Sequence, residues 1–449
     1  MSPGTAERAR HWLLRGARVL DPATGRDGIR DLRVLDGVLV GAAPEGAPPA
    51  RVFEATGLVA APSFVDPHVH FREPGDGLSE TTASGLAAAA EGGYGSVFCM
   101  ANTEPVNDGP AVTEAILRAA RAADSPVRLH VVSAATRGLL GRDPVDLAGQ
   151  KAAGVAAVSD DGRPVVDDAV MGEVLVRAAE LGLPVFSHCE TPSLHPGGVA
   201  HDGAAARRLG LAGIPGESEA RMVRRDIALA ERLGVPVHIC HLSTAAAVQA
   251  VRGAKERGLP VTAEAAPHHL ALSDEDLLRT LPGGLPDARL KMNPPLRAAA
   301  DRDAVIAALA DGTIDCVATD HAPHHEGRKR GCGFVKAAFG VIGLENAFSA
   351  LHDRLVVPGT IPLSALLERM SAGAARVARI PGHSLAAGSR AAVVLLDLQA
   401  RVPVLAAEFA SLSRNCPFDG LTLRGRVVGL LAGDRLYQSR TISSVRIRT

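Results

Sequence analysis

Residues 66–75 read Asp-Pro-His-Val-His-Phe-Arg-Glu-Pro-Gly and directly follow an apolar run, residues 58–65, that predicts a β-strand. Side chains alternate across a strand, so His68 and His70 are expected to point the same way. Two neutral imidazoles on one face at a strand end can hold one metal ion. Arg72 has the same parity, and its guanidinium could grip a carboxylate if the strand extends that far. Taken alone, the His-x-His pair is explained equally well as two polar residues at a strand end.

The composition narrows the class of protein. The chain has 449 residues, of which 47% are hydrophobic and 22% charged, and its net charge is −1, as in ordinary globular proteins. It contains no long run of Lys or Arg that would predict nucleic-acid binding, and no apolar stretch long enough to cross a bilayer. The six scattered cysteines form no C-x-x-C pair, and the first residues lack the apolar core of a signal peptide. We therefore expect a cytoplasmic protein with no nucleic-acid or membrane partner.

From about residue 60 to residue 380, short apolar runs rich in β-forming residues alternate with helical stretches rich in Ala, Leu, Glu and Arg. Such alternation implies parallel strands joined by crossover helices. Eight units in about 300 residues predict an α/β fold of the (β/α)8 TIM-barrel type, with a doubly wound open sheet as the alternative. The expected strands are residues 58–65, 95–100, 127–133, 155–158, 185–187, 237–241, 261–265 and 315–318.

The two ends of the chain have a different pattern. Residues 12–60 and 385–449 contain short alternating runs and tight turns, which are typical of β-strands. We expect these two segments to form one small β-sandwich domain, and residues 61–384 to form the barrel. Two long, Gly-rich polar segments, residues 195–217 and 324–340, are expected to be binding loops or a lid at the rim of the barrel.

Metal-binding residue types follow several of the expected strands. They are Asp160 and Asp161 after the fourth strand, His188 after the fifth, His241 at the end of the sixth, and Asp320 after the eighth. Active sites of such barrels lie at the carboxyl ends of the strands, so we expect these side chains to meet His68 and His70 at one rim. Parity does not decide between Asp160 and Asp161, because the end of that strand is uncertain. Parity does predict that Cys240 faces the helices, away from His241.

The expected ligand set contains histidines and carboxylates but no thiolate, which suits zinc in an open catalytic site. Four histidines with two carboxylates exceed the needs of one ion, so we expect two zinc ions bridged by a carboxylate. Bound metal lowers the pKa of water, and Asp320 could take the released proton and pass it to a leaving nitrogen. These residues predict a metal-dependent hydrolase that cleaves an amide-like C–N bond.

Further polar residues lie at or just beyond the expected strand ends: Arg72, Asn102, Asn293 and His324. Together they could bind a small anionic substrate that has amide edges. Each of them alone is explained equally well by a structural role, such as a turn residue for Asn102 or a cap for Asn293.

Several segments resemble the dihydroorotases of the longer, two-domain type, which belong to the amidohydrolase superfamily. These segments are residues 66–75, 159–162, 187–190, 240–244, 267–270, 291–297, 318–324 and 415–420. The resemblance extends from about residue 12 to the end of the chain. It implies the reversible cyclisation of N-carbamoyl-L-aspartate to (S)-dihydroorotate, the third step of de novo pyrimidine synthesis.

The resemblance also implies a role for each matching residue. His68 and His70 would bind a first zinc ion, and His188 and His241 a second. Asp161 would be the bridging carboxylate, while Asp320 would be the catalytic base and also a metal ligand. The implied substrate-binding positions are His70, Arg72, Asn102, Asn293 and His324, together with the backbone at Phe339 and Gly340.

Two other functions stay open. Hydantoinases and related cyclic amidases resemble this fold but usually bridge their metals with a carboxylated lysine, whereas residues 158–161 read Val-Ser-Asp-Asp. Some relatives have lost their ligands and serve only as partners of aspartate transcarbamoylase, but every ligand position is present here. A homo-oligomer and a complex with aspartate transcarbamoylase both stay open. Residues 331–336, in the expected lid, depart from the family pattern.

Overall fold

Eight parallel strands form the central part of the protein, in a computed structural model that describes residues 6–279, 286–440 and 447–448. The strands follow one another along the chain as the sequence predicts. Their bounds are β7 (Phe64–Val69), β8 (Tyr94–Cys99), β9 (Arg128–Ser133), β10 (Val155–Val158), β11 (Phe186–Ser187), β14 (Val237–Ile239), β15 (Val261–Ala265) and β16 (Cys316–Val317).

These strands pair as two four-stranded sheets, in the orders β10-β9-β8-β7 and β11-β14-β15-β16. Isolated parallel bridges, Val158 with Val185 and Val69 with His321, join the remaining edges of the two sheets. Every pair is parallel, so the carboxyl ends of all eight strands lie on the same side. This arrangement brings residues that are far apart in the sequence to one rim.

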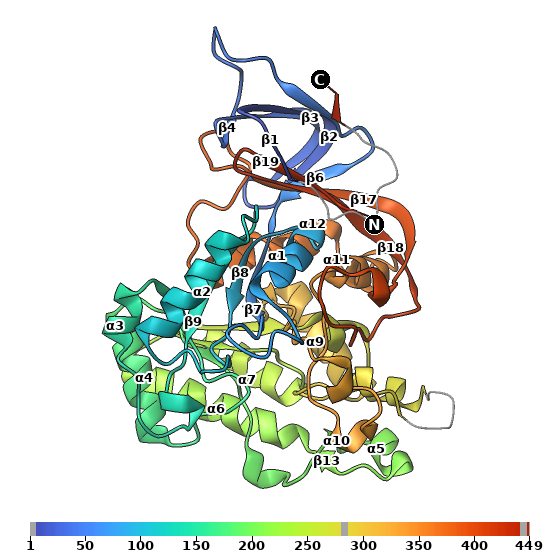
Figure 1. Ribbon diagram of the computed structural model, residues 1–449. Helices are drawn as coiled ribbons and strands as arrows, with labels where there is room; N and C mark the ends of the chain where they lie inside the picture. The colour runs from blue at the N-terminus through green and yellow to red at the C-terminus, as the bar shows by residue number, and fades with distance from the viewer. Residues whose placement is uncertain (1–5, 280–285, 441–446, 449) are drawn as a thin grey trace.

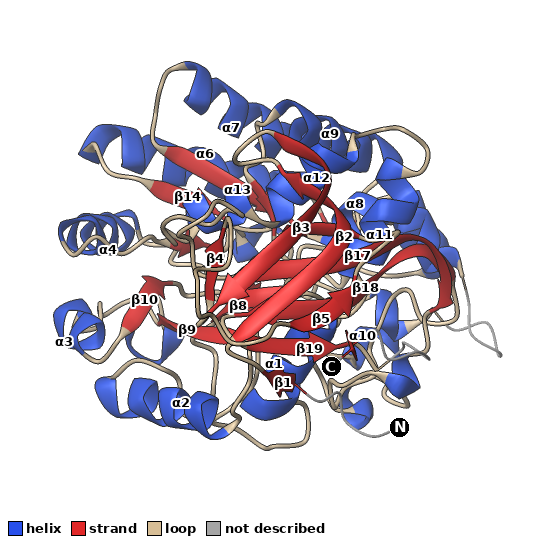
Figure 2. Ribbon diagram, turned by 90° about the horizontal axis from the view of Figure 1, so that it is seen from above, coloured by secondary structure: helices blue, strands red, loops and turns tan. Residues whose placement is uncertain are grey.

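Helices connect the strands and surround them, as Figures 1 and 2 show. The longer ones are α1 (Thr82–Glu91), α2 (Pro110–Ala122), α4 (Asp168–Glu180), α6 (Gly216–Leu233), α7 (Ala245–Glu256), α9 (Ala299–Asp311) and α12 (Leu363–Met370). The shorter ones are α3 (Leu147–Ala152), α5 (Ala204–Leu209), α8 (Pro267–Ala271), α10 (Gly333–Lys336), α11 (Ala347–Leu351) and α13 (Ala372–Val377). No helix within the described ranges is both long and apolar enough to span a membrane.

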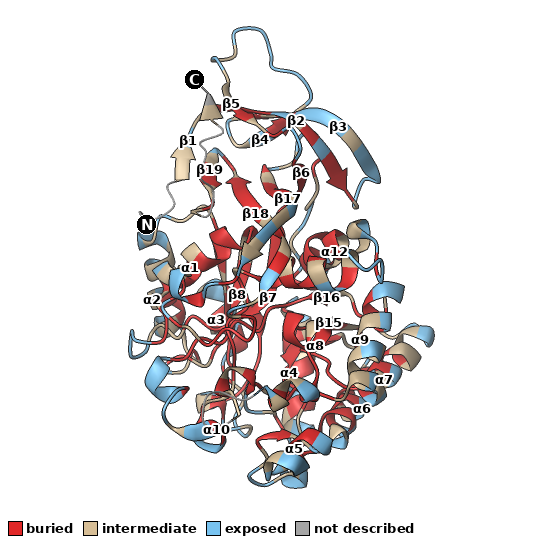
Figure 3. Ribbon diagram, turned by 90° about the vertical axis from the view of Figure 1, so that its right-hand side faces the viewer, coloured by how far each residue is buried: buried red, intermediate tan, exposed pale blue. Residues whose placement is uncertain are grey.

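Side-chain caps fix where several helices begin. Thr81, Asp167 and Thr244 each accept a hydrogen bond from a backbone N–H in the first turn of α1, α4 and α7, respectively. The apolar faces of the helices then pack against the outer faces of the strands, in the main core cluster. Large apolar residues such as Val65, Phe98 and Phe186 form a separate buried cluster. Figure 3 shows the buried residues concentrated in the centre of the molecule.

Strands from both ends of the chain share a second, ten-stranded sheet, which lies above the parallel strands in Figure 1. They are β1 (Ala6–Arg8), β2 (His11–Asp21), β3 (Arg26–Leu35), β4 (Val38–Val40), β5 (Arg51–Glu54), β6 (Val59–Pro62), β17 (Ala392–Pro403), β18 (Thr422–Ala432), β19 (Arg435–Gln438) and β20 (Ile447–Arg448). The order is β1-β19-β18-β17-β6-β2-β3-β4, and β5 pairs with both β2 and β20. This sheet has its own core, which includes Trp12, Phe53 and Leu395. A separate two-stranded sheet, β12 (Ala200–His201) with β13 (Gly213–Ile214), lies in the long segment after β11.

The single strand expected over residues 58–65 is wrong, because two strands occupy this region. β6 (Val59–Pro62) belongs to the ten-stranded sheet, whereas β7 (Phe64–Val69) belongs to the parallel strands. The backbone N–H of Ser63 donates to Ala392 O, and that of Phe64 donates to Gly93 O, so the chain changes partners between these two residues. One apolar run therefore feeds both sheets, and His68 lies within β7 rather than after a strand end.

A buried polar cluster connects the ten-stranded sheet to helix α1. The Tyr437 hydroxyl donates a 2.6 Å hydrogen bond to Glu91 Oε1, and Arg440 Nε donates to the same oxygen at 2.7 Å. Both Tyr437 and Glu91 are buried. Buried polar groups stabilise a protein only when they are paired, so this contact ties the two parts of the structure together.

Replacing Tyr437 by Phe is expected to lower the free energy of unfolding by about 1–2 kcal/mol, because the buried Glu91 loses a hydrogen bond. The matched control is Tyr94→Phe, since the Tyr94 hydroxyl is buried without a hydrogen-bond partner among the described residues. The control should leave stability unchanged or raise it. Denaturant unfolding followed by circular dichroism measures both variants, and an equal loss in the two would contradict the role of the Glu91 contact.

Candidate metal centre

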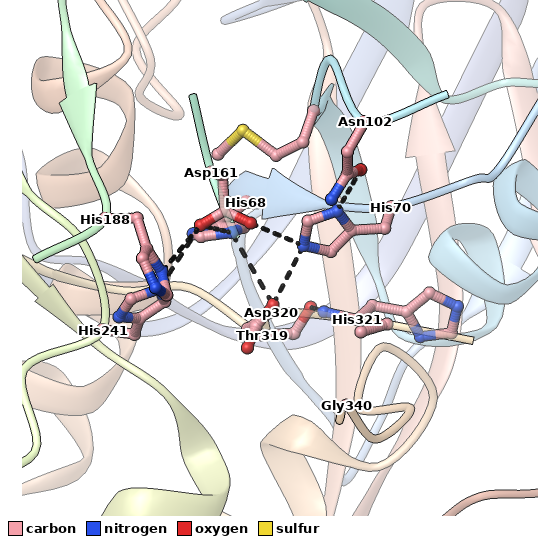
Figure 4. A network of polar contacts seen from close by, with 12 residues as sticks. His68, His70, Asn102, Asp161, His188, His241, Thr319, Asp320, His321 and Gly340 are labelled. Atoms are coloured by element: carbon pink, nitrogen blue, oxygen red, sulfur yellow. Dashed lines mark hydrogen bonds and ion pairs between the residues drawn. The ribbon is translucent and has the colours of Figure 1, made fainter. Parts of the chain in front are cut away.

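Five buried side chains gather around the buried Asp161 near the carboxyl ends of the parallel strands, as Figure 4 shows. Oxygens of Asp161 lie 3.3 Å from His68 Nε2, 3.3 Å from His70 Nε2, 3.3 Å from His188 Nδ1 and 3.4 Å from His241 Nε2. Asp320 Oδ1 lies 3.1 Å from His70 Nε2 and 3.6 Å from His68 Nε2. The structure thus brings together the six residues that the sequence marks as metal-competent.

Hydrogen bonds fix the tautomers of the first two histidines. His68 Nδ1 donates to Glu264 Oε1 at 2.8 Å, and His70 Nδ1 donates to Asn102 Oδ1 at 2.8 Å. In these tautomers each Nε2 carries a lone pair, and that lone pair faces carboxylate oxygens. A lone pair held against an anion is repulsive unless a cation lies between them. This arrangement therefore fits a metal ion.

The second pair of histidines shows the same feature. His188 Nδ1 and His241 Nε2 lie only 3.0 Å apart, and both face Asp161 Oδ1. His188 Nε2 donates a 3.2 Å hydrogen bond to Glu190 Oε2. In this tautomer Nδ1 carries the lone pair. Two convergent imidazole nitrogens beside a carboxylate suit a divalent cation such as zinc.

The electrostatics of the cluster lead to the same conclusion. Burial raises the pKa of Asp161, but the charge of His68 and hydrogen bonds from His188 and His241 outweigh burial and hold that pKa well below its usual range. Burial lowers the pKa of His188, yet hydrogen bonds to Asp161 and Glu190 raise it to about 10. The buried carboxylates thus require positive charge beside them, which either protons or a metal cation can supply.

The structure distinguishes between the two neighbouring aspartates. Asp160 turns away from the histidines: its Oδ1 accepts from the backbone N–H of Ala135 at 2.7 Å and of Thr136 at 3.0 Å, and its Oδ2 accepts from the Thr136 hydroxyl. Asp161, in contrast, lies among the four imidazoles. Asp160 therefore holds the end of β10 against the loop that follows β9.

Strand alternation does not extend to every site residue. Arg72, His241 and Asp320 have φ of 56°, 31° and 48°, in the left-handed region that L-residues rarely adopt. β7 ends at Val69 and β14 ends at Ile239, so parity does not orient the residues that follow them. The prediction that Cys240 faces the helices is accordingly wrong, since its sulfur lies within 4.8 Å of the donor atoms of His68 and Glu264.

Glu264, on β15, is a site residue that the sequence analysis missed. It is fully buried, and its two oxygens accept hydrogen bonds from His68 Nδ1 at 2.8 Å and His238 Nε2 at 3.0 Å. His238 Nδ1 in turn is 2.9 Å from Thr262 Oγ1. The signal in the sequence is a lone acidic residue inside an apolar strand, because buried carboxylates are nearly always paired.

A cavity of about 600 Å³ lies beside the cluster, and Arg72, Asn102 and His324 line it. Asn293 reaches the site from another direction, because its Nδ2 donates to Glu190 Oε2 at 3.1 Å. The structure therefore places these four sequence-predicted residues around the histidine cluster, as expected for a substrate pocket.

The backbone at Phe339 and Gly340 contacts His324, which lines this cavity. His324 Nε2 donates to Phe339 O at 2.6 Å, so His324 Nδ1 is left as an acceptor. Gly340 has a φ of 123°, and a Cβ there would lie 2.7 Å from the Ala322 Cβ and 3.1 Å from His324 Nε2. Only glycine fits this close approach.

Asn415 supports the same residues from the C-terminal part of the chain. Its Nδ2 donates to Ala322 O at 3.0 Å and to Gly340 O at 3.1 Å, and its Oδ1 accepts from the backbone N–H of His324 at 3.3 Å. Asn415 lies within a segment that the family resemblance covers, but nothing in the sequence pattern itself indicates this role.

The fold defines the class of protein. The structure is similar to D-hydantoinase (dihydropyrimidinase) from Thermus sp., with a TM-score of 0.80 and 23% identity over 97% of each chain. It is also similar to L-hydantoinase (dihydropyrimidinase) from Arthrobacter aurescens, with a TM-score of 0.79 and 23% identity over 94% of each chain. The protein thus has an α/β fold of the amidohydrolase type.

Sequence comparison is more specific. Residues 57–247 match the model of the dihydro-orotase-like family. The chain is 46% identical to a dihydroorotase from Anaeromyxobacter dehalogenans over 94% of this chain and 97% of the relative. It is 41% identical to a dihydroorotase from Solibacter usitatus over 96% of this chain and 99% of the relative. The chain belongs to the dihydroorotase family, as the resemblance of its motifs predicts.

Replacing Glu264 by Gln is expected to weaken divalent-metal binding by about 10- to 100-fold, because groups that orient a ligating histidine tune its affinity by that amount. Competition with a chelator, read by zinc content, measures the change. Glu219→Gln is the matched control, since Glu219 is equally buried but accepts from Ser243 and Thr244 rather than from the histidines. Equal losses of metal affinity in both variants would contradict the role of Glu264.

Proposed function

We infer that the protein is a dihydroorotase, a hydrolase that opens the cyclic amide of (S)-dihydroorotate to N-carbamoyl-L-aspartate and closes it again. The observation that carries this inference is the similarity to proteins named dihydroorotase at 41–46% identity over nearly the whole chain. The site agrees with it, because the histidines, carboxylates and substrate-side residues implied by the family motifs are adjacent in space. The reaction belongs to pyrimidine biosynthesis.

We propose two zinc ions: His68, His70 and Asp320 would hold one, His188 and His241 would hold the other, and Asp161 would contribute to both. When bound, the metal activates water for attack and polarises the ring carbonyl. Glu264 and Asn102 orient His68 and His70 by accepting hydrogen bonds from their Nδ1 atoms. Glu190 orients His188 by accepting a hydrogen bond from Nε2.

Asp320 is proposed as the catalytic base. Burial raises the pKa of Asp320, but the proton and positive charge that protonated His70 and His68 would place beside it lower that pKa below its usual value, so the carboxylate is ionised. An ionised carboxylate at this position takes a proton from the attacking water and returns it to the ring nitrogen as the C–N bond breaks. In the reverse direction the same carboxylate takes the proton from the carbamoyl nitrogen.

The electrostatics of the cavity suit an anionic substrate. Burial and the positive charges of Arg72, Lys329 and Arg328 lower the pKa of His324 to about 2, so its ring is neutral in a positively charged environment. The Arg72 guanidinium supplies paired N–H donors for a carboxylate, and neutral His324 offers Nδ1 to an N–H group of the ligand. Asn102 and Asn293 supply amide groups that can form hydrogen bonds with the amide edges of the ligand.

We also propose the finer architecture and setting of this enzyme. The bridges at Val158 and Val69 support closure of the eight strands into one barrel over residues 61–384. The ten-stranded sheet would form a β-sandwich domain from residues 12–60 and 385–449, around its separate core. We propose a cytoplasmic location for this enzyme. A homo-oligomer and a complex with aspartate transcarbamoylase are two assemblies that it could form.

The alternative of a hydantoin-opening enzyme is less well supported. Its relatives usually need a carboxylated lysine as the metal bridge, whereas Asp161, which lies 3.3 Å from both His68 Nε2 and His188 Nδ1, is the bridge proposed here. Absorbance assays of ring opening with dihydroorotate, dihydrouracil and hydantoin test the inference directly. Turnover of dihydroorotate alone supports it, and preferred turnover of an uncharged ring would overturn it.

Asp320→Asn is expected to reduce kcat by roughly 100- to 10,000-fold, because the amide cannot accept the proton of the attacking water. The metal content should fall by a smaller factor than kcat, since the amide oxygen can still act as a metal ligand. Far-UV circular dichroism serves as the control for folding. A folded, metal-loaded variant with wild-type turnover would defeat the assignment of the base.

Arg72→Met is expected to lower kcat/KM for dihydroorotate by roughly 10- to 100-fold, the value of about 1.5–3 kcal/mol for hydrogen bonds to a charged group. The matched control is Arg401→Met, which removes an exposed guanidinium on β17 of the ten-stranded sheet and should leave the kinetics unchanged. If Arg72→Met retains wild-type kcat/KM, Arg72 does not bind the substrate carboxylate.

A further inference from the structure

A buried ammonium group fastens the loop formed by residues 324–340 to the rest of the structure. Lys329 is only 2% exposed. Its Nζ donates three hydrogen bonds to backbone carbonyls, to Ala288 O at 2.9 Å, Lys291 O at 2.9 Å and Ala338 O at 2.7 Å. Two acceptors lie in residues 288–291 and the third lies in the same loop as Lys329, so one side chain joins the loop to that other segment.

Burial of the Lys329 ammonium costs free energy unless its N–H groups are hydrogen-bonded, so the three contacts are needed to keep it buried. Burial and the nearby charge of Lys291 lower the pKa of Lys329 to about 7. The negative charge of Asp287 offsets only part of this lowering, and the hydrogen bonds of Nζ within the described ranges go to backbone carbonyls. The protonated ammonium has three N–H donors, and three carbonyl oxygens accept them all. Such complete pairing offsets the cost of burial and fixes the geometry of all three partners.

The carbonyls that Lys329 holds lie next to the proposed substrate residues. Lys291 O also accepts from the backbone N–H of Gly340 at 3.0 Å. Ala338 directly precedes Phe339, whose carbonyl accepts the proton of His324 Nε2. Lys291 itself lies two residues before Asn293. Lys329 therefore connects the backbone that carries Asn293 to the backbone that carries Phe339 and Gly340.

Lys291 joins the same segments a second time. Its Nζ donates to Val335 O at 2.8 Å and lies 4.4 Å from the centroid of the Phe339 ring. A cation above an aromatic face is attracted to the ring electrons. The two lysines thus cross between the segments in opposite directions, one from each side.

We propose that Lys329 is a positioning residue, which holds Asn293 and the Phe339–Gly340 backbone at the right separation to bind substrate. This role rests on the proposed function, because it assumes that those groups contact the ligand. Lys329 itself does not line the cavity, and its Nζ bonds to backbone carbonyls rather than to the proposed metal ligands. Its loss should therefore weaken substrate binding far more than it slows the chemical step.

The test compares Lys329→Met with Lys336→Met, which removes an exposed lysine from α10 in the same loop and serves as the matched control. The Lys329 variant should raise KM for dihydroorotate by about tenfold, equivalent to about 1.4 kcal/mol, with a smaller change in kcat and unchanged zinc content. Hydrogen exchange should become faster in residues 286–293 and 324–340 only. The control should change neither quantity.

Other outcomes separate the possible failures. Unchanged KM and unchanged exchange in Lys329→Met would overturn the proposal, as would faster exchange throughout the protein, which indicates a general structural role. If Lys329→Met fails to fold, Lys329→Gln, which keeps an N–H donor, takes its place in both measurements. If the wild-type protein does not turn over dihydroorotate, the proposed function fails, while local exchange still tells whether Lys329 fastens the two segments.

Discussion

The structure depends on one electrostatic constraint: imidazole lone pairs are held against carboxylate oxygens. Glu264 and Asn102 accept hydrogen bonds from Nδ1 of His68 and His70, respectively. The Nε2 lone pairs of both histidines therefore face Asp161 and Asp320. Such an arrangement is stable only when positive charge lies between the donors. The residues that surround the cluster fix the tautomers, so they shape the proposed metal site as much as the proposed ligands do.

The fold meets this constraint through parallel strands. Because every strand of the central part runs in the same direction, residues separated by as many as 252 positions in the chain, such as His68 and Asp320, arrive at one rim. The ten-stranded sheet contributes at a distance, through the Tyr437–Glu91 contact with α1. The C-terminal part of the chain also supplies Asn415, which holds His324 and Gly340 in place.

The sequence predicted the order of the strands and that these histidines and carboxylates meet at one rim, because hydrophobic periodicity and strand ends are local properties. It could not choose between Asp160 and Asp161, since that choice depends on hydrogen bonds that Asp160 accepts from the backbone of Ala135 and Thr136, in the loop that follows β9. Alternation also failed beyond the strand ends, where Cys240 turns toward His68. The two strands within residues 58–69 were merged because an apolar run does not reveal which partner each residue pairs with.

We propose that Asp161 lies between two metal ions. X-ray diffraction from crystals of the zinc-loaded protein, recorded on both sides of the zinc absorption edge, would locate the ions. We expect two anomalous peaks, one beside His68 and His70 and one beside His188 and His241, with the Asp161 carboxylate between them. A single peak elsewhere, for example at His238, Glu264 and Cys316, or no peak near Asp161 would show that Asp161 does not bridge two metal ions.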